Sequence, residues 1–146
     1  MKWVTWKNIG VDRMASIWLI RRWIDPDAEF SFIPVGGKLL PEQGEPFDIP
    51  GTRYSHHGGH CTFYALLSEQ SLQDPILKRI ARLIDEADEL QEITVEPAAL
   101  GLDLICRGLR QISQDDFEAF ERGSLIYDAL YAQLKSDSTA AGTDEN

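Results

Sequence analysis

All three histidines of this chain lie in the segment SHHGGHCTF, residues 55–63, together with one of its two cysteines. Gly58 and Gly59 argue against a continuous helix here, so we expect a glycine-turned loop that leads into a helix near Cys61. The dipole at a helix N-terminus favours a thiolate, and His56 or His57 on the folded-back loop could then approach it.

Three interpretations of this histidine loop remain open. Imidazole and thiolate are good ligands for zinc or another borderline-soft metal ion, although the remaining ligands would have to come from elsewhere in the fold. The same pair could form an activated cysteine nucleophile. The segment could also be a surface loop with a cysteine at the start of a helix.

The expected first helix, residues 11–24, contains a further candidate for the site, an arginine. Arg13 falls in the same helical arc as Ile17, Ile20 and Ile24, so we expect it to point inward. A buried guanidinium needs a partner, which could be a carboxylate such as Asp12 or Asp128, or a bound oxyanion. Two further arginines lie off this arc and indicate a solvated face: Arg21 and Arg22.

Two other segments carry titratable groups. The sequence DEADE, residues 85–89, places four carboxylates at the end of an expected helix, where a cation could offset the dipole but a solvated acidic end is more common. Cys106 falls on an apolar stripe, which predicts a buried thiol in the core.

The pattern of the whole chain predicts one compact, mostly helical α+β domain with about five helices and a few short strands. Strands are expected at 3–6 and 30–33, and a loop rich in proline and glycine at 34–60. Further helices are expected over TFYALLSE, after an N-cap at Asp74, after Pro97, and from about Asp115 to Leu134. We place the domain at residues 1–135 and expect residues 136–146 to be a disordered acidic tail.

Composition limits the environment and the partners. The formal net charge of −10 opposes direct binding to nucleic acid. We find neither a stretch of apolar residues that could span a membrane nor the apolar core of a signal peptide. Two cysteines do not make a disulfide framework, so the expected compartment is the cytoplasm, with both thiols reduced.

Several segments together resemble the C-terminal domain of the ChrB family of chromate-resistance proteins. They are VDRMASIWLIRRWIDPDAEFSFIP at 11–34, PFDIPG at 46–51, HHGGHCTF at 56–63, Asp74-Pro75, EAD at 86–88 and LIYDALY at 125–131. The resemblance implies a role in chromate resistance, as a chromate-responsive regulator or as a companion to chromate efflux. The polar positions that match the family are Asp12, Arg13, Arg21, Arg22, Asp25, His56, Cys61, Asp88 and Asp128.

The sequence also departs from this family. Ser16-Ile17 stands where the family often has Cys-Pro, and Tyr64 stands where an acidic residue often follows the phenylalanine of the histidine loop. These changes would alter a metal or redox site that used those residues. The family's regulators carry an N-terminal DNA-binding region, and DNA binding is not carried over to this chain.

We therefore expect a cytoplasmic, stress-response domain that binds a divalent transition metal such as zinc, or a chromate-like oxyanion, as a sensor or accessory module. The expected metal ligands are His56 and Cys61. The expected surrounding ligand-binding residues are Asp12, Arg13, Arg21, Arg22, Asp88 and Asp128. The alternatives are a metal- or cysteine-dependent redox or hydrolytic enzyme, and a protein-interaction module that lost its site with Ser16 and Tyr64.

Overall fold

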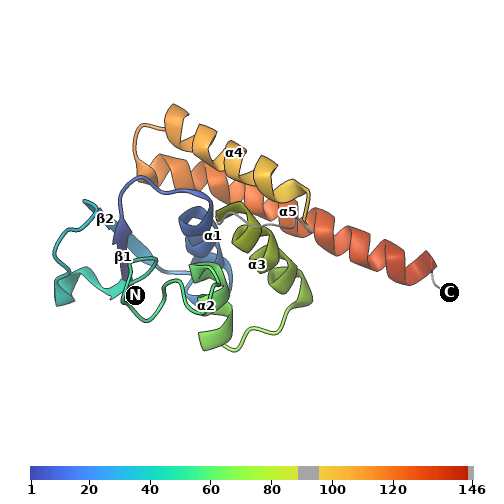
Figure 1. The fold of residues 1–146 in the computed structure, drawn as a ribbon, viewed down its shortest axis with the longest axis horizontal. Coiled ribbons are helices and arrows are strands. Elements are labelled where there is room, and N and C mark those ends of the chain that lie inside the picture. The colour runs from blue at the N-terminus through green and yellow to red at the C-terminus, as the bar shows by residue number, and fades with distance from the viewer. Residues whose placement is uncertain (89–95, 145–146) are drawn as a thin grey trace.

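The computed structural model describes residues 1–88 and 96–144. Its elements, in chain order, are β1 (Lys2–Trp6), α1 (Val11–Leu19), η1 (Ile20–Ile24), β2 (Glu29–Ile33), η2 (Pro41–Gln43), β3 (Glu45–Pro46), α2 (Thr62–Glu69), α3 (Pro75–Asp88), α4 (Ala98–Ile112) and α5 (Asp116–Asp144). A small sheet lies at one end of the molecule, and the helices gather beside it (Figure 1). The predicted α+β, mostly helical fold is confirmed.

The sheet is parallel throughout, with strand order β2-β1-β3. Val4 of the central strand pairs with Ser31 on one side and with Pro46 on the other. The two predicted strands are confirmed, whereas β3 lies within the segment expected to be a loop. Proline is tolerated in this two-residue strand because β3 lies at an edge of the sheet, where the backbone groups on its outer side need no hydrogen-bond partner in a neighbouring strand.

Helix α1 connects β1 to β2 and forms the centre of the core. Apart from Arg13, every residue of this helix is buried, and α1 contacts each of the other four α-helices. The chain leaves the helix through the π-helical turn η1, where the N–H of Asp25 donates to the carbonyl of Ile20 (2.6 Å). The predicted end before Pro26 is confirmed, because a residue that precedes proline is disfavoured in the helical conformation.

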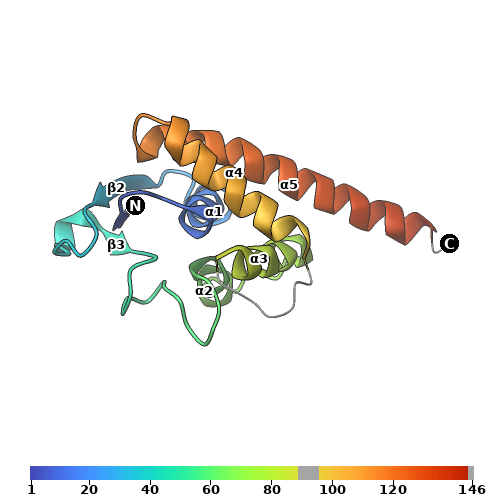
Figure 2. The same ribbon diagram turned by 45° about the horizontal axis from the view of Figure 1, so that its top comes forward.

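The remaining helices surround α1, and α4 lies alongside α5 in both views (Figures 1 and 2). The N-cap predicted at Asp74 is confirmed, since its carboxylate accepts the N–H of Ile76 (2.8 Å). Asp115 caps α5 through the N–H of Glu118 (2.9 Å). Within the described residues no helix is long and apolar enough to cross a membrane.

Helix α5 is longer than the sequence predicts. It continues to Asp144, whereas the predicted helix ends at Leu134 and the predicted tail begins at Ser136. Leu134 is the last buried residue of the helix up to residue 140, and the side chains of 135–140 are exposed. The spacing of apolar residues predicted where the buried side chains end, at Leu134. The backbone stays helical beyond that point, to Asp144.

Candidate metal centre

Asp12 lies in the first turn of α1, and its buried carboxylate reaches the start of α2. Oδ2 accepts the N–H of Thr62 (2.9 Å), and Oδ1 accepts the N–H of Phe63 (3.0 Å). These two N–H groups belong to the first turn of α2 and have no partner within that helix. The side chain is only 3% exposed, so the contacts fix it firmly between two helix N-termini.

His56 is held above Asp12 by a tight turn in the chain. The backbone groups of His57 and His60 bond to each other in both directions (3.2 and 3.0 Å), and Gly58 and Gly59 between them have φ values of +58° and +80°. Positive φ at both central residues is typical of a type I′ turn, which glycine adopts without strain. The predicted glycine turn is confirmed.

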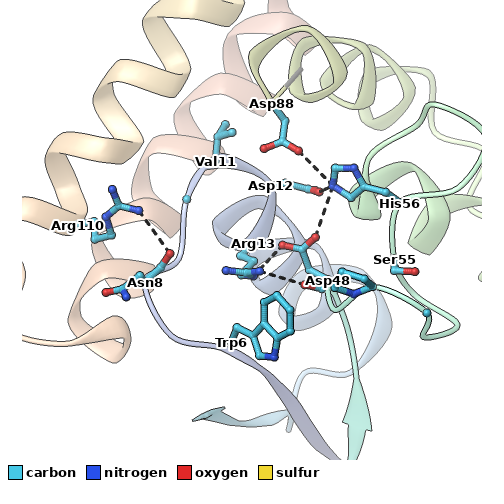
Figure 3. Close-up of a pocket in the computed structure, with 13 residues that line it drawn as sticks. Trp6, Asn8, Val11, Asp12, Arg13, Asp48, Ser55, His56, Asp88 and Arg110 are labelled. Carbon is cyan, nitrogen blue, oxygen red and sulfur yellow. Dashed lines mark hydrogen bonds and ion pairs between the residues drawn. The ribbon is translucent and has the colours of Figure 1, made fainter. Parts of the chain in front are cut away.

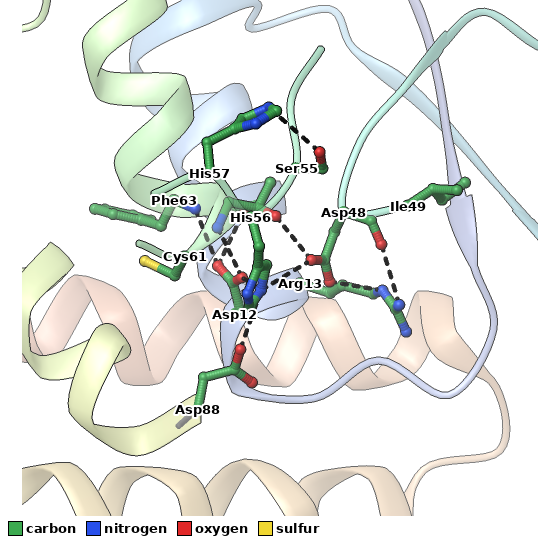
Figure 4. Close-up of polar contacts among 12 residues, drawn as sticks. Asp12, Arg13, Asp48, Ile49, Ser55, His56, His57, Cys61, Phe63 and Asp88 are labelled. Carbon is green, nitrogen blue, oxygen red and sulfur yellow. Dashed lines mark hydrogen bonds and ion pairs between the residues drawn. The ribbon is translucent and has the colours of Figure 1, made fainter. Parts of the chain in front are cut away.

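Three carboxylates surround the imidazole of His56 (Figure 4). Its Nε2 lies 3.0 Å from Asp12 Oδ2, 3.1 Å from Asp88 Oδ2 at the end of α3, and 3.6 Å from Asp48 Oδ1. The hydrogen bond to Asp12 is the main reason that the pKa of His56 is raised to about 9, and the negative charges of all three carboxylates add to it.

Asp48 follows β3 in a loop that two aromatic residues anchor. Phe47 and Tyr54 are buried and contact Trp3, with ring centroids 6.2 and 5.9 Å apart, and the N–H of Asp48 donates to Tyr54 O (2.7 Å). Asp48 Oδ1 accepts the hydroxyl of Thr62 (2.7 Å). Burial and the nearby Asp12 charge raise the pKa of Asp48 to about 7.

Arg13 faces inward, as the sequence predicts, but its partner differs from both predicted carboxylates. Its Nε lies 2.8 Å from Asp48 Oδ2, and its Nη2 donates to the carbonyl of Asp48 (3.1 Å). Neither Asp12 nor Asp128 pairs with Arg13. Asp12 caps α2, and Asp128 pairs with Arg22 of η1. The side chain is 17% exposed and passes over the ring of Trp6.

Among the described residues, the group able to hold a metal ion is Asp12, Asp48 and His56. One potential ligand atom from each lies within 4.8 Å of the others. The cluster opens into a pocket of about 570 Å³ (Figure 3), whose wall also includes Asp88 and Arg110. Two carboxylates and one imidazole are a donor set suited to a divalent cation such as zinc.

Cys61 is not part of this cluster. It is the N-cap of α2, as predicted, but its Sγ points away from His56 and lies 3.8 Å from the carbonyl of Ala81 (Figure 4). Burial, reinforced by the charges of Asp12 and Asp85, raises the pKa of the thiol far above its usual range. The predicted approach of Cys61 to His56 is wrong, because the sulfur packs in the core against Ala81 of α3. The same burial outweighs the helix dipole that would favour a thiolate.

Three residues that the family resemblance selected lie away from the pocket and connect η1 to α5. Arg21 pairs with Glu121 (2.7 Å), and Arg22 pairs with Asp128 (2.6 Å). Asp128 also accepts the indole N–H of Trp18 (2.8 Å). These contacts join two helical elements, so Arg21, Arg22 and Asp128 are placed to stabilise the fold and not to contact a ligand in the pocket.

The acidic segment at 85–89 is not a solvated helix end in its described part. Asp85 accepts the N–H of Cys61 (2.7 Å) and lies 2.9 Å from Nδ1 of His60. Glu86 accepts the N–H of Glu96 (2.6 Å), and Asp88 contacts His56. Three carboxylates that the sequence suggested were solvated therefore hold loops in place; Glu89 lies outside the described residues.

The two departures from the family pattern have different surroundings. Ser16 is buried, with its hydroxyl 3.4 Å from Asp12 Oδ1, one turn along α1. Tyr64 is exposed and stacks on His60, with ring centroids 4.0 Å apart. Ser16 therefore borders the cluster.

Cys106 is buried beside Tyr127, which confirms the predicted core thiol.

Sequence reasoning missed Asp48 as a site residue. It lies between Phe47 and Ile49 in a segment of prolines and glycines, with no helical or strand periodicity to assign it a direction. One signal could have identified Asp48. It is an acidic residue between Phe47 and Ile49, and a segment this apolar is expected to be partly buried, so its carboxylate would need a partner.

The fold and the cluster together define a helical α+β domain with an acidic, histidine-containing pocket. A family model described as "ChrB, C-terminal domain" matches residues 3–134. The protein named "Protein ChrB" from Cupriavidus metallidurans is 30% identical over 136 residues. The chain belongs to the family of ChrB C-terminal domains.

The match to the Cupriavidus protein covers 92% of this chain and 41% of that protein, so the chain spans less than half of its relative's length. No solved structure matches the chain.

Proposed function

We propose that this domain binds one divalent transition-metal ion, with zinc as the reference ion, through Asp12, Asp48 and His56, and that it serves chromate resistance as a cytoplasmic sensor or accessory module. The observation that carries the proposal is the convergence of these three potential ligands, from three separate segments, at the wall of one pocket. The link to chromate resistance rests on the family alone.

Charge favours a cation over an oxyanion in this pocket. Asp12, Asp48 and Asp88 place three carboxylates around His56, and the guanidinium of Arg13 is already paired with Asp48. Beside His56 a doubly negative anion such as chromate would face these carboxylates directly, whereas a divalent cation would relieve the repulsion among them.

The raised pKa values support the same choice. His56, with a pKa of about 9, and Asp48, with a pKa of about 7, both retain protons to unusually high pH. The neighbouring carboxylates favour the protonated form of His56 and outweigh its burial, whereas burial and the charge of Asp12 favour the protonated form of Asp48. A metal ion can replace those protons and satisfy the same lone pairs. Three protein ligands would leave at least one coordination position open toward the pocket, as in zinc sites that bind an exogenous ligand.

Isothermal titration calorimetry on the metal-stripped chain tests the proposal. We expect one Zn²⁺ per chain, and no heat of binding from sodium chromate or sulfate added to the metal-free protein. Asp48→Asn should weaken zinc binding at least tenfold, while Cys61→Ser is the matched control that should leave it unchanged. Binding of chromate without zinc, or equal affinity of Asp48→Asn and wild type, would contradict the proposal.

A metal-dependent hydrolase is the second candidate, favoured by the size of the pocket. Its volume of about 570 Å³ is far larger than one ion needs, and it extends past the cluster to Trp6 and Arg110. A zinc-bound water facing this space would be a suitable nucleophile. Zinc-stimulated hydrolysis of activated phosphate or carboxylate esters, lost in Asp48→Asn and retained in Cys61→Ser, would support this candidate over simple binding.

A further inference from the structure

Helix α4 exposes an apolar face to solvent. Leu100, Leu104, Ile105 and Ile112 are between 51% and 72% exposed, while Ala99, Leu102 and Cys106 are buried on the opposite side. At about 100° per residue, the outward residues fall within roughly 140° of arc. We define the outer α4 face as Leu100, Gly101, Leu104, Ile105, Gly108, Gln111 and Ile112. A helix that is apolar on both sides is typical of a buried helix.

Packing inside the described chain does not explain two glycines in this face. A Cβ atom added at Gly101 or Gly108 would meet no atom within 4 Å beyond the neighbouring backbone of the helix, so close packing does not require glycine at either position. Each glycine costs about 1 kcal/mol of helix stability relative to alanine. Small residues beside exposed leucines instead offer depressions into which a second helix can place its own large side chains.

We propose that the outer α4 face binds the same face of a second copy of this chain, with the two α4 helices antiparallel. A two-fold axis near residue 106 places Leu104 of each copy over Gly108 of the other, and Ile112 over Gly101. Large residues therefore meet small ones at the centre and at both ends, as an isologous interface requires. Figure 1 shows α4 at the edge of the molecule with α5 along one side, and in Figure 2, which turns that edge forward, α4 lies in front.

The charges that border the outer α4 face favour this second copy. Asp103 and Arg107 form an ion pair within α4 (3.0 Å), on one edge of the face. In the antiparallel arrangement the same edge of each helix meets, so Arg107 of each copy approaches Asp103 of the other, whereas a parallel two-fold pair would place these edges on opposite sides of the interface. The order of acid and base along the helix is therefore self-complementary, which favours another copy over an unrelated helix.

Sedimentation equilibrium of the wild-type chain at concentrations up to about 100 µM tests the proposal, since a micromolar Kd would make it mainly dimeric there. Leu104→Glu should restore the monomer mass. Leu125→Glu, at an equally exposed leucine on α5 (70%), is the matched control and should stay dimeric. Gly108→Glu keeps the test valid if Leu104→Glu misfolds, because glutamate favours helix more than glycine does and open space surrounds this position.

Disulfide cross-linking tests the orientation. Both native thiols are buried, so single cysteines can be introduced on the surface. Ile105→Cys lies beside the two-fold axis and should form a covalent dimer on oxidation. The two Leu100→Cys thiols would be about 18 Å apart along the helices and should not form one. A monomeric wild type, a dimer that persists in both glutamate variants at positions 104 and 108, or cross-linking at position 100 would overturn the proposal.

Discussion

Asp12 has a structural role and a proposed ligand role at the same time. Its oxygens accept two N–H groups at the start of α2, and Oδ2 also contacts His56. A carboxylate fixed in this way loses little conformational freedom when it binds a metal ion, because folding has already ordered it. The same contacts explain how a buried charge is tolerated at this position.

Arg13 is expected to contribute to stability through Asp48. Arg13→Ala would leave a largely buried carboxylate without its cation, and we expect a loss of about 3 kcal/mol in the free energy of unfolding. Arg13→Lys keeps the charge but not the simultaneous contacts with the side chain and carbonyl of Asp48, so an intermediate loss is expected. Urea unfolding measures both variants. Wild-type stability in Arg13→Ala would show that this ion pair contributes nothing.

His56 should make the stability of the metal-free protein depend on pH. Its pKa in the folded chain, about 9, lies above the ordinary value of 6.5, so protonation stabilises the fold fully below pH 6.5 and the effect is lost as pH rises through 9. His56→Gln should therefore be less stable than wild type at pH 6, by about 1 kcal/mol after solvent screening. The gap should close by pH 10; a gap that does not change with pH would contradict this account.

At the residue scale, the sequence predicted His56, Arg13 and the turn at Gly58-Gly59 from local chemistry. It assigned Cys61 wrongly because the direction of an N-cap side chain depends on tertiary packing, which here places the sulfur against Ala81. Asp48 was missed because its position depends on Phe47 and Tyr54 reaching Trp3, a contact that links distant parts of the chain.

At the element scale, three helix ends meet at the proposed centre. The N-termini of α1 and α2 supply or hold Asp12, and the C-terminal end of α3 supplies Asp88. Periodicity and capping residues predicted these helices well, since each buries a regular apolar stripe. Strand β3 was not predicted, because a two-residue strand next to glycine has no periodicity of its own.

The last part of α5 should be dispensable for stability. The side chains of 136–140 are exposed, so truncation after Lys135 removes no buried apolar surface among them. We expect a change of less than about 0.5 kcal/mol in the free energy of unfolding. Thermal unfolding followed by circular dichroism measures it. Loss of cooperative unfolding in the truncated chain would instead indicate that this end of the helix stabilises the fold.

At the scale of the whole molecule, the acidic chain concentrates negative charge in a pocket that also retains protons. Zinc must displace the protons of His56 and Asp48, so its affinity should rise with pH. Between pH 7 and 8, mainly one proton is displaced, and we expect about a tenfold gain in affinity. Calorimetry in buffers of different ionisation enthalpy counts the released protons. A pH-independent affinity would place the metal elsewhere.

The most direct test of the proposed centre is the ligand shell of the bound metal. X-ray absorption of the chain loaded with one equivalent of zinc should show only nitrogen and oxygen ligands, at about 2.0–2.2 Å, because Asp12, Asp48 and His56 supply them and the Cys61 sulfur points away. The spectrum should be unchanged in Cys61→Ser and altered in His56→Gln. A sulfur shell at about 2.3 Å that disappears in Cys61→Ser would contradict the account.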